Sequence, residues 1–170
     1  LIYASATKDG DEYRSQMYFA DYSDEFSSSR SVDNMIKTGN KPNIGTFAVD
    51  TLNNIMYYTK CINNENNDCF IYYSVFKKDK WKNKGVLPIG DRHTDAAHPA
   101  LSANGKRLYF TSNRAGGYGG SDIWYIEKKQ NGKWDYKPIN AGAVVNTAGN
   151  EAFPYVVGNT LILFETFNPL

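Results

Sequence analysis

Short apolar and aromatic runs alternate with polar turns along the chain, and this arrangement recurs about every fifty residues. The clearest copy extends from Ala100 to Thr111: a short apolar run, a polar turn, and an apolar-aromatic run that closes on Thr. Residues 48–59 align with it without a gap, and a further copy begins at Phe153. The recurrence predicts a fold assembled from repeated units.

Each unit also contains a third and a fourth strand-like run. The third run begins at Met17, Ile71 and Ile123 in successive units, and a polar turn and a weaker fourth run follow it. A single aromatic residue follows that turn in each unit: Phe26, Trp81 and Trp134. Four short strands joined by polar turns are the signature of a propeller blade. We therefore predict an all-β fold, a β-propeller of four-stranded antiparallel blades.

The second and third runs of each unit are almost continuously apolar and aromatic. Strands of this composition are covered on both faces, as happens when blades stack on their neighbours. We therefore expect the recurrent aromatic residues to pack between blades and not to stack on a ligand.

The repeat divides one propeller segment into blade parts at residues 1–43, 44–95, 96–149 and 150–170. This makes about three and a third blades, whereas a closed ring usually has at least about four. The open ends would leave strand edges free to pair with other chains. We expect either that further blades of a larger propeller lie outside this sequence or that chains associate to cover the edges.

Charge and hydropathy narrow the classes of partner. Nineteen basic and eighteen acidic side chains give a net charge of +1, which provides no electrostatic footprint for nucleic acid. No apolar run approaches the roughly twenty residues that a spanning helix needs, so we expect no direct membrane insertion.

Two cysteines, Cys61 and Cys69, bracket a polar loop between two strand-like runs. A disulfide between them would tie the mouth of a hairpin loop; two independent thiols are the alternative. A disulfide at this place would point to an oxidising compartment.

A glycine-rich loop precedes Asp122. Its glycines are Gly116, Gly117, Gly119 and Gly120. A dinucleotide-binding fingerprint needs a helix after the loop, but a strand follows here. A calcium-binding nonapeptide needs an acidic residue where Ser121 stands, and many tandem copies. We interpret the segment as a tight turn in which the glycines supply positive φ and Asp122 accepts backbone N–H groups.

The connections between units carry the densest polar residues, which we take as a candidate partner or ligand face. These residues are Asp91, His93, Asp95, His98, Asn146, Asn150 and Glu151. Asp and His can ligate a metal, but their spacing here is no recognised ligand pattern, so we predict no metal site. Hydrogen bonding among the blade connections and recognition of a partner at the channel mouth both remain open.

Two short segments match catalytic motifs, and we attribute both matches to chance. Ser5 and Lys8 fit S-x-x-K and Lys37 opens K-T-G, but that chemistry needs a buried helix start inside an α/β domain. The sequence contains neither G-x-S-x-G nor H-E-x-x-H. We predict no enzyme, no catalytic residue and no cofactor.

Residues 98–114 resemble the TolB-type, WD40-like propeller repeat. Residues 116–124 and 139–154 resemble, more particularly, the propeller repeats of OmpA-family envelope proteins of Bacteroidetes-type bacteria, including one associated with type IX secretion. The resemblance is strongest over 92–165, weaker over 44–91 and fragmentary over 1–43. It implies a non-catalytic, periplasmic, outer-membrane-associated module with protein partners in the envelope. Peptidoglycan would be bound only through domains not present here.

Three functions follow from this reasoning. The resemblance favours a scaffold module of an envelope assembly, of which type IX secretion is one example. A propeller that binds a glycan or peptide in its channel is the second, and glycan binding predicts exposed aromatic residues at the channel mouth. The third is the gating propeller of a larger peptidase, which requires a hydrolase domain outside this sequence.

Overall fold

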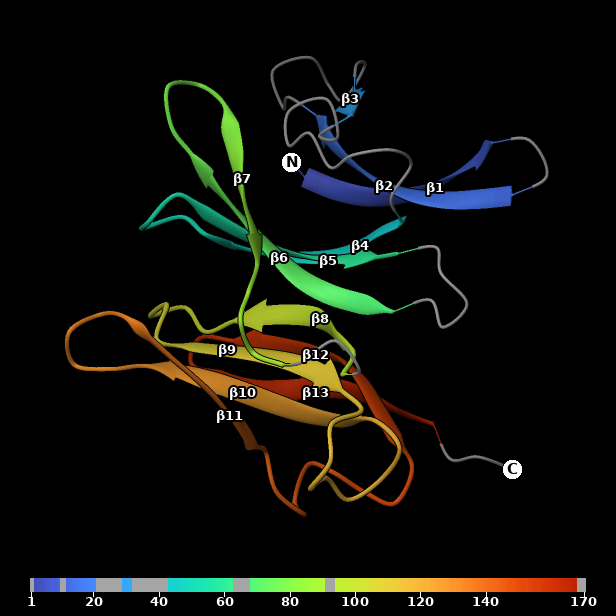
Figure 1. Cartoon of the computed structure of the whole chain (residues 1–170), viewed down its shortest axis with the longest axis vertical. Coiled ribbons are helices and arrows are strands. Elements are labelled where there is room, and N and C mark those ends of the chain that lie inside the picture. The colour runs from blue at the N-terminus through green and yellow to red at the C-terminus, as the bar shows by residue number, and fades with distance from the viewer. Residues whose placement is uncertain are drawn as a thin grey trace.

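The computed structural model describes residues 2–9, 12–20, 29–31, 43–62, 68–90 and 94–167. Every regular element in these residues is a β-strand (Figure 1). No described helix is long and apolar enough to cross a membrane.

The described strands form antiparallel sheets in which consecutive strands pair, in chain order. The first sheet contains β1 (Ile2–Asp9), β2 (Glu12–Ala20) and β3 (Ser29–Ser31). The second contains β4 (Asn43–Asp50), β5 (Ile55–Cys61), β6 (Cys69–Phe76) and β7 (Trp81–Val86). The third contains β8 (Ala96–Leu101), β9 (Arg107–Ser112), β10 (Asp122–Lys128) and β11 (Trp134–Asn140). The fourth contains β12 (Asn150–Val157) and β13 (Thr160–Phe167).

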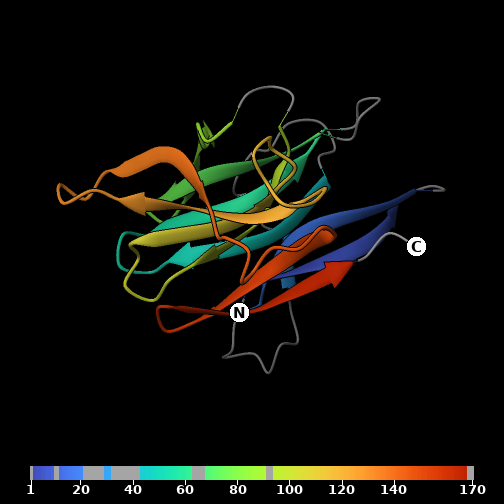
Figure 2. The same cartoon turned by 90° about the horizontal axis from the view of Figure 1, so that it is seen from below.

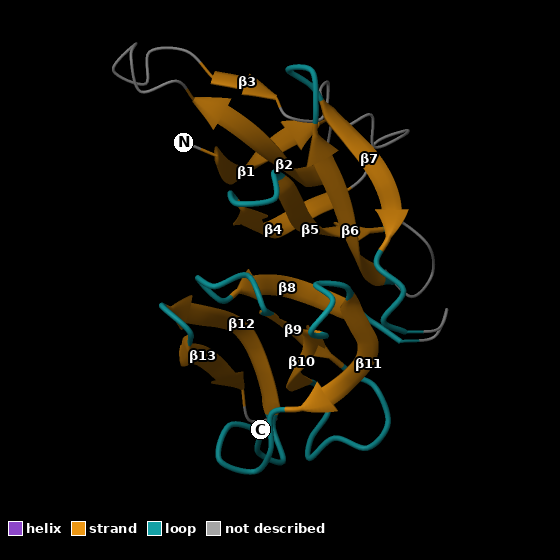
Figure 3. Cartoon of the chain, turned by 90° about the vertical axis from the view of Figure 1, so that its left-hand side faces the viewer, coloured by secondary structure: helices purple, strands orange, loops and turns teal. Residues whose placement is uncertain are grey.

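The sheets stack face against face in the order of the chain (Figures 1 and 3). Strand β8 contacts β4, β5 and β6 of the second sheet, and β12 contacts β8, β9 and β10 of the third. Figure 2, seen from below, shows the third and fourth sheets in front of the second. Within the described residues no strand of the fourth sheet pairs with the first.

The main core lies between the second and third sheets. Its buried members are Tyr57, Ile71, Leu87, Ile89, Ala96, Leu108, Phe110, Trp124 and Ile126. A smaller cluster of Ile44, Met56 and Tyr58 includes residues that alternate with Tyr57 along β5 and so lie on its other face. Both faces of β5 are therefore buried, which explains its continuous apolar run.

The recurrent tryptophans occupy different surroundings. The Trp134 ring meets Tyr57 of the neighbouring sheet edge-on, with ring centroids 6.1 Å apart, and its Nε1 donates to the Tyr57 hydroxyl at 3.0 Å. Burial raises the pKa of Tyr57 to about 12. Trp81 contacts Phe76 within its own sheet, at 5.2 Å between centroids. Phe26 lies outside the described residues.

Candidate functional site

The innermost strand of the second, third and fourth sheets is interrupted by a bulge. Two residues there oppose a single residue of the next strand: 45–46 in β4, 98–99 in β8 and 153–154 in β12. His98 and Phe153 each have a φ of 54°, a left-handed conformation that is costly for a side chain of this size. Because a bulge re-aims the side chain that it carries, the strained residues leave the normal inward–outward alternation.

A cavity of about 410 Å³ opens along these three strands. Its lining comes from residues 46–49, 98–101 and 153–156, among which there is no Asp, Glu, Lys or Arg. The rings of His98 and Phe153 stack in it, with centroids 3.9 Å apart and planes inclined by 27°. The repeat therefore brings equivalent positions of successive units together around one uncharged cavity.

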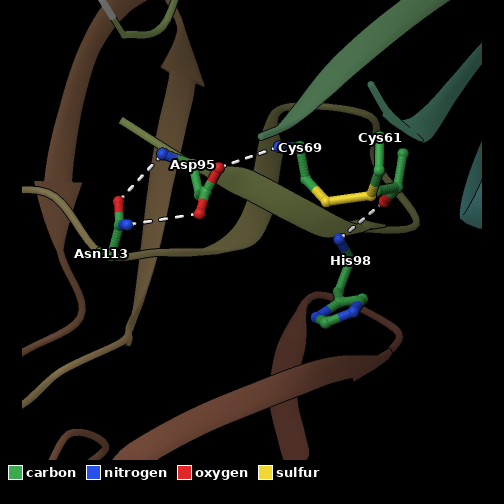
Figure 4. Close-up of a disulfide and its surroundings, with 6 residues drawn as sticks. Cys61, Cys69, Asp95, His98 and Asn113 are labelled. Carbon is green, nitrogen blue, oxygen red and sulfur yellow. Dashed lines mark hydrogen bonds between the residues drawn. A yellow bond between two sulfur atoms is a disulfide. The ribbon is translucent and has the colours of Figure 1, made fainter. Parts of the chain in front are cut away.

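His98 is held from two directions. Its backbone N–H donates to the hydroxyl of Thr59 in the second sheet at 2.9 Å (Figure 4). Its Nδ1 lies 3.3 Å from the Thr111 hydroxyl. Burial lowers the pKa of His98 to about 4, so the ring is neutral near pH 7. The hydroxyl of Thr46, at the equivalent position in β4, is buried without a hydrogen-bond partner among the described residues.

Asp95 joins the second and third sheets at the end where β8 begins. Its carboxylate accepts the backbone N–H of Cys69 at 2.9 Å, while its own N–H donates to the Asn113 side chain at 2.9 Å (Figure 4). Cys69 also forms a disulfide with Cys61, which closes the loop between β5 and β6. Asp95 therefore forms hydrogen bonds to both the second and the third sheet. Hydrogen bonding among the blade connections is one of the two roles that the sequence leaves open for the polar residues there, and partner recognition is the other. Asp91 and His93 lie outside the described residues.

The corresponding connection between the third and fourth sheets is internal. Asn146 accepts the N–H of Ile123 at 2.8 Å and donates to its carbonyl at 3.0 Å. Glu151, which is fully buried, accepts the backbone N–H and the hydroxyl of Thr147. Both side chains are therefore buried and hydrogen-bonded within the connection, and their part in a partner or ligand face stays a prediction. Asn150 is half-buried.

The glycine loop is a tight turn. We expected its glycines to supply positive φ, but most of them are needed because neighbouring groups leave no room for a side chain. Only Gly116 has a positive φ, of 89°. A Cβ at Gly119 would lie 2.0 Å from the Gly149 carbonyl oxygen, and one at Gly117 would lie 2.2 Å from the Asp122 carboxylate. A Cβ at Gly120 would approach the side chain of Asn150 to 2.5 Å. Close approach of neighbouring groups thus excludes side chains at three of the four positions.

The carboxylate of Asp122 holds this loop in place through hydrogen bonds. Its carboxylate accepts the N–H groups of Tyr118 and Gly119 at 2.6 and 3.0 Å, which is the interaction that the sequence predicts, and also the side-chain amide of Asn140 at 2.8 Å. Asp122 is almost fully buried, and these bonds satisfy its carboxylate there.

Sequence reasoning missed Thr46 and Phe153 as cavity residues. Their alignment with His98 could have identified them, because the three residues occupy the same position in successive units although their types differ. No group of three or more His, Cys, Asp or Glu that could hold a metal occurs in the described parts of the chain. The cavity itself presents apolar side chains and a stacked pair of rings.

Comparison with known proteins bears on the fold. No family model matches the chain, and no curated protein matches it either. Among solved structures, the crystal structure of TolB from Acinetobacter baumannii is similar, with a TM-score of 0.54 and 18% identity. The likeness covers 96% of this chain and 36% of the TolB chain, so this chain spans about a third of that protein.

The fold is a β-propeller. At this identity the likeness carries the architecture alone, and with the stacked four-stranded sheets it confirms the all-β propeller fold expected from the repeat. It also supports the TolB-type part of the resemblance seen in the sequence.

Proposed function

We propose that this chain is a non-catalytic protein-interaction module of a bacterial cell-envelope assembly. The observation that carries the proposal is the uncharged cavity along the innermost strands, into which strained bulges turn His98 and Phe153. Strained backbone persists where the surrounding structure over-determines it, and it concentrates at functional sites. An uncharged, partly aromatic lining suits an apolar segment of a partner and offers no acid–base pair for catalysis.

The envelope assignment rests on two further features. A disulfide between Cys61 and Cys69 is compatible with an oxidising compartment such as the periplasm. The repeat also resembles that of OmpA-family proteins with outer-membrane association, one of them linked to type IX secretion. In its narrower form, the proposal places the protein in the periplasm, in association with the outer membrane, and gives it a role in type IX secretion.

A propeller that binds a glycan or peptide directly is the second candidate. The exposed ring of Phe153 favours it, since 45% of this residue is accessible and its ring already stacks on a neutral His98. Aromatic faces exposed in a cavity are suited to the apolar face of a sugar ring or to a peptide side chain.

Crosslinking in the native envelope tests the proposal. A photoreactive residue in place of Phe153 should give adducts with envelope proteins, and Phe153→Asn should weaken binding of the identified partner without unfolding the chain, because Asn tolerates a positive φ. Leu52→Asn is the matched control at an exposed turn. Recovery of cytoplasmic proteins alone would contradict the proposal, and saturable binding of a purified glycan to the isolated protein would favour the second candidate.

A further inference from the structure

A polar cavity of about 360 Å³ lies where the turn between β8 and β9 meets the turn between β12 and β13. Its lining comes from these two turns and from the adjoining ends of β9 and β10, and every lining residue is polar or charged. It shares no lining residue with the cavity along the innermost strands. We call it the turn cavity.

Hydrogen bonds fix two asparagine side chains of this lining. A backbone hydrogen bond of 2.7 Å joins the two turns, and beside it the N–H of Asn104 donates to the side-chain oxygen of Asn159 at 3.0 Å. The side-chain oxygen of Asn104 in turn accepts the hydroxyl of Ser102 at 2.8 Å and the N–H of Lys106 at 2.9 Å. Both amide oxygens are therefore occupied by donors of the turns themselves.

The amide nitrogens of the same two side chains remain as donors. Because a backbone N–H can bond only to the oxygen of an amide, these contacts establish which end of Asn104 and of Asn159 is the NH2 group. In the part of the chain that the structure describes, neither NH2 group has an acceptor, and both side chains are exposed. Since their oxygens are already held, little conformational entropy is lost when a ligand binds the nitrogens.

Lys106 adds a positive charge to these donors. The other two cations of the lining are paired: Arg107 donates to the Glu127 carboxylate at 2.9 Å, and Lys128 lies 3.3 Å from the carboxylate of Asp50. Lys106 is exposed and has no carboxylate within ion-pair distance among the described residues. The turn cavity thus combines one uncompensated positive charge with two fixed amide donors.

We propose that the turn cavity binds an oxyanion, a carboxylate or a phosphate, carried by a small ligand. An ammonium and N–H groups form charge-assisted hydrogen bonds to the oxygens of such a group. A divalent cation is a poor match, because it needs oxygen ligands and the uncommitted groups here are donors. The inference goes beyond the proposed protein interaction and does not rest on it, since different residues carry the two.

A nuclear magnetic resonance titration of the purified protein tests the proposal. The probes are galacturonate, inorganic phosphate and galactose, which is the uncharged counterpart of galacturonate. At least one of the two anions should shift the side-chain NH2 resonances of Asn104 and Asn159 saturably, and galactose should not. Saturation by galacturonate alone would identify a sugar carboxylate as the ligand group, and saturation by phosphate alone a phosphate.

Two variants supply the second readout. Asn159→Asp keeps the oxygen that accepts the N–H of Asn104 but replaces the donor with an oxygen, and Lys106→Gln removes the charge. Each should weaken the dissociation constant of the saturating anion at least about tenfold, as the loss of a hydrogen bond to a charged group does, with an unchanged melting temperature. Asn131→Asp and Lys82→Gln are matched controls that should leave it unchanged. Both residues are exposed, and the Asn131 side chain also accepts a backbone N–H of its own turn, at 3.1 Å.

Three results would overturn the inference: no saturable shift with either anion, equal shifts with galactose, or a dissociation constant within about twofold of wild type in either variant. Saturable shifts at His98 and Phe153 in place of Asn104 and Asn159 would put the anion in the cavity along the innermost strands and would overturn it as well. None of these results would affect crosslinking of partners from position 153, so the proposed function and this site fail separately.

Discussion

At the residue scale, the unusual features gather at the bulges of the innermost strands and at buried carboxylates. His98 combines a left-handed backbone, a ring stacked on Phe153 and a pKa lowered to about 4 by burial. None of these properties is visible in its sequence neighbours. They arise because a bulge turns the side chain into a cavity shared by several sheets.

The lowered pKa of His98 makes stability depend on pH. The unfolded chain, in which the histidine pKa is about 6.5, takes up a proton before the folded chain does, so the free energy of unfolding falls below about pH 6.5 and levels off below about pH 4. Allowing for screening of the partly exposed ring, we expect wild type to lose about 1 kcal/mol more than His98→Asn between pH 7 and pH 5. Urea unfolding at both pH values measures this. Equal losses in the two proteins would show that His98 is not the group responsible.

Asp122 gives a second prediction at the residue scale. Asp122→Ala removes the acceptor of two backbone N–H groups and the Asn140 amide, and should lower the free energy of unfolding by about 2 kcal/mol. Asp135→Ala is the matched control, because Asp135 is exposed and its ion pair with Lys129 is long, at 3.6 Å. Thermal unfolding of both variants tests this prediction. If Asp122→Ala and Asp135→Ala unfold at the same temperature, the structural role assigned to Asp122 is wrong.

At the element scale, the hairpin of β5 and β6 is closed by a disulfide, and the backbone of one of its cysteines is hydrogen-bonded to the residue just before β8. Cys61 and Cys69 are directly opposite each other in the register, and the N–H of Cys69 donates to Asp95. The disulfide therefore constrains the chain close to the contact between the second and third sheets.

Removing this disulfide should lower the free energy of unfolding by about 2.5 kcal/mol, the chain-entropy value for a loop of this length. The double variant Cys61→Ser/Cys69→Ser and wild type in a thiol reductant should lose similar stability in urea unfolding. The double variant itself should not respond to the reductant. A wild-type midpoint that is the same with and without reductant would contradict the prediction.

At the scale of the whole molecule, stability depends on contacts between sheets. The main core is shared by the second and third sheets, and the hydrogen bond from Trp134 to Tyr57 spans the same boundary. Because each sheet buries its apolar face only against a neighbour, we expect the two sheets to unfold together.

A double-mutant cycle measures this coupling. Tyr57→Phe removes the acceptor hydroxyl and keeps its ring, whereas Trp134→Phe removes the donor N–H and replaces the indole with a smaller aromatic ring. Their interaction energy should be about 1 kcal/mol. Tyr57→Phe combined with Trp81→Phe is the control, since Trp81 packs beside the cluster on the other face of β5. Additivity in the Tyr57–Trp134 cycle would mean that the inter-sheet bond contributes nothing beyond packing.

The sequence by itself determined the strands and their order. Each recurring apolar run must be covered on both faces, and four-stranded sheets that stack on one another provide this cover. The function of Asp122 in its turn was also predictable, since an Asp after a glycine loop has backbone N–H groups within reach.

Only the tertiary structure decided which side chains line the cavity and which polar residues are buried. His98 and Phe153 meet because bulges in separate strands turn them toward each other, and sequence spacing does not encode that direction. Glu151 looks like a surface carboxylate in the sequence, yet it is fully buried and its carboxylate is bonded to Thr147. Local pattern specifies elements, whereas side-chain exposure is set by what packs against them.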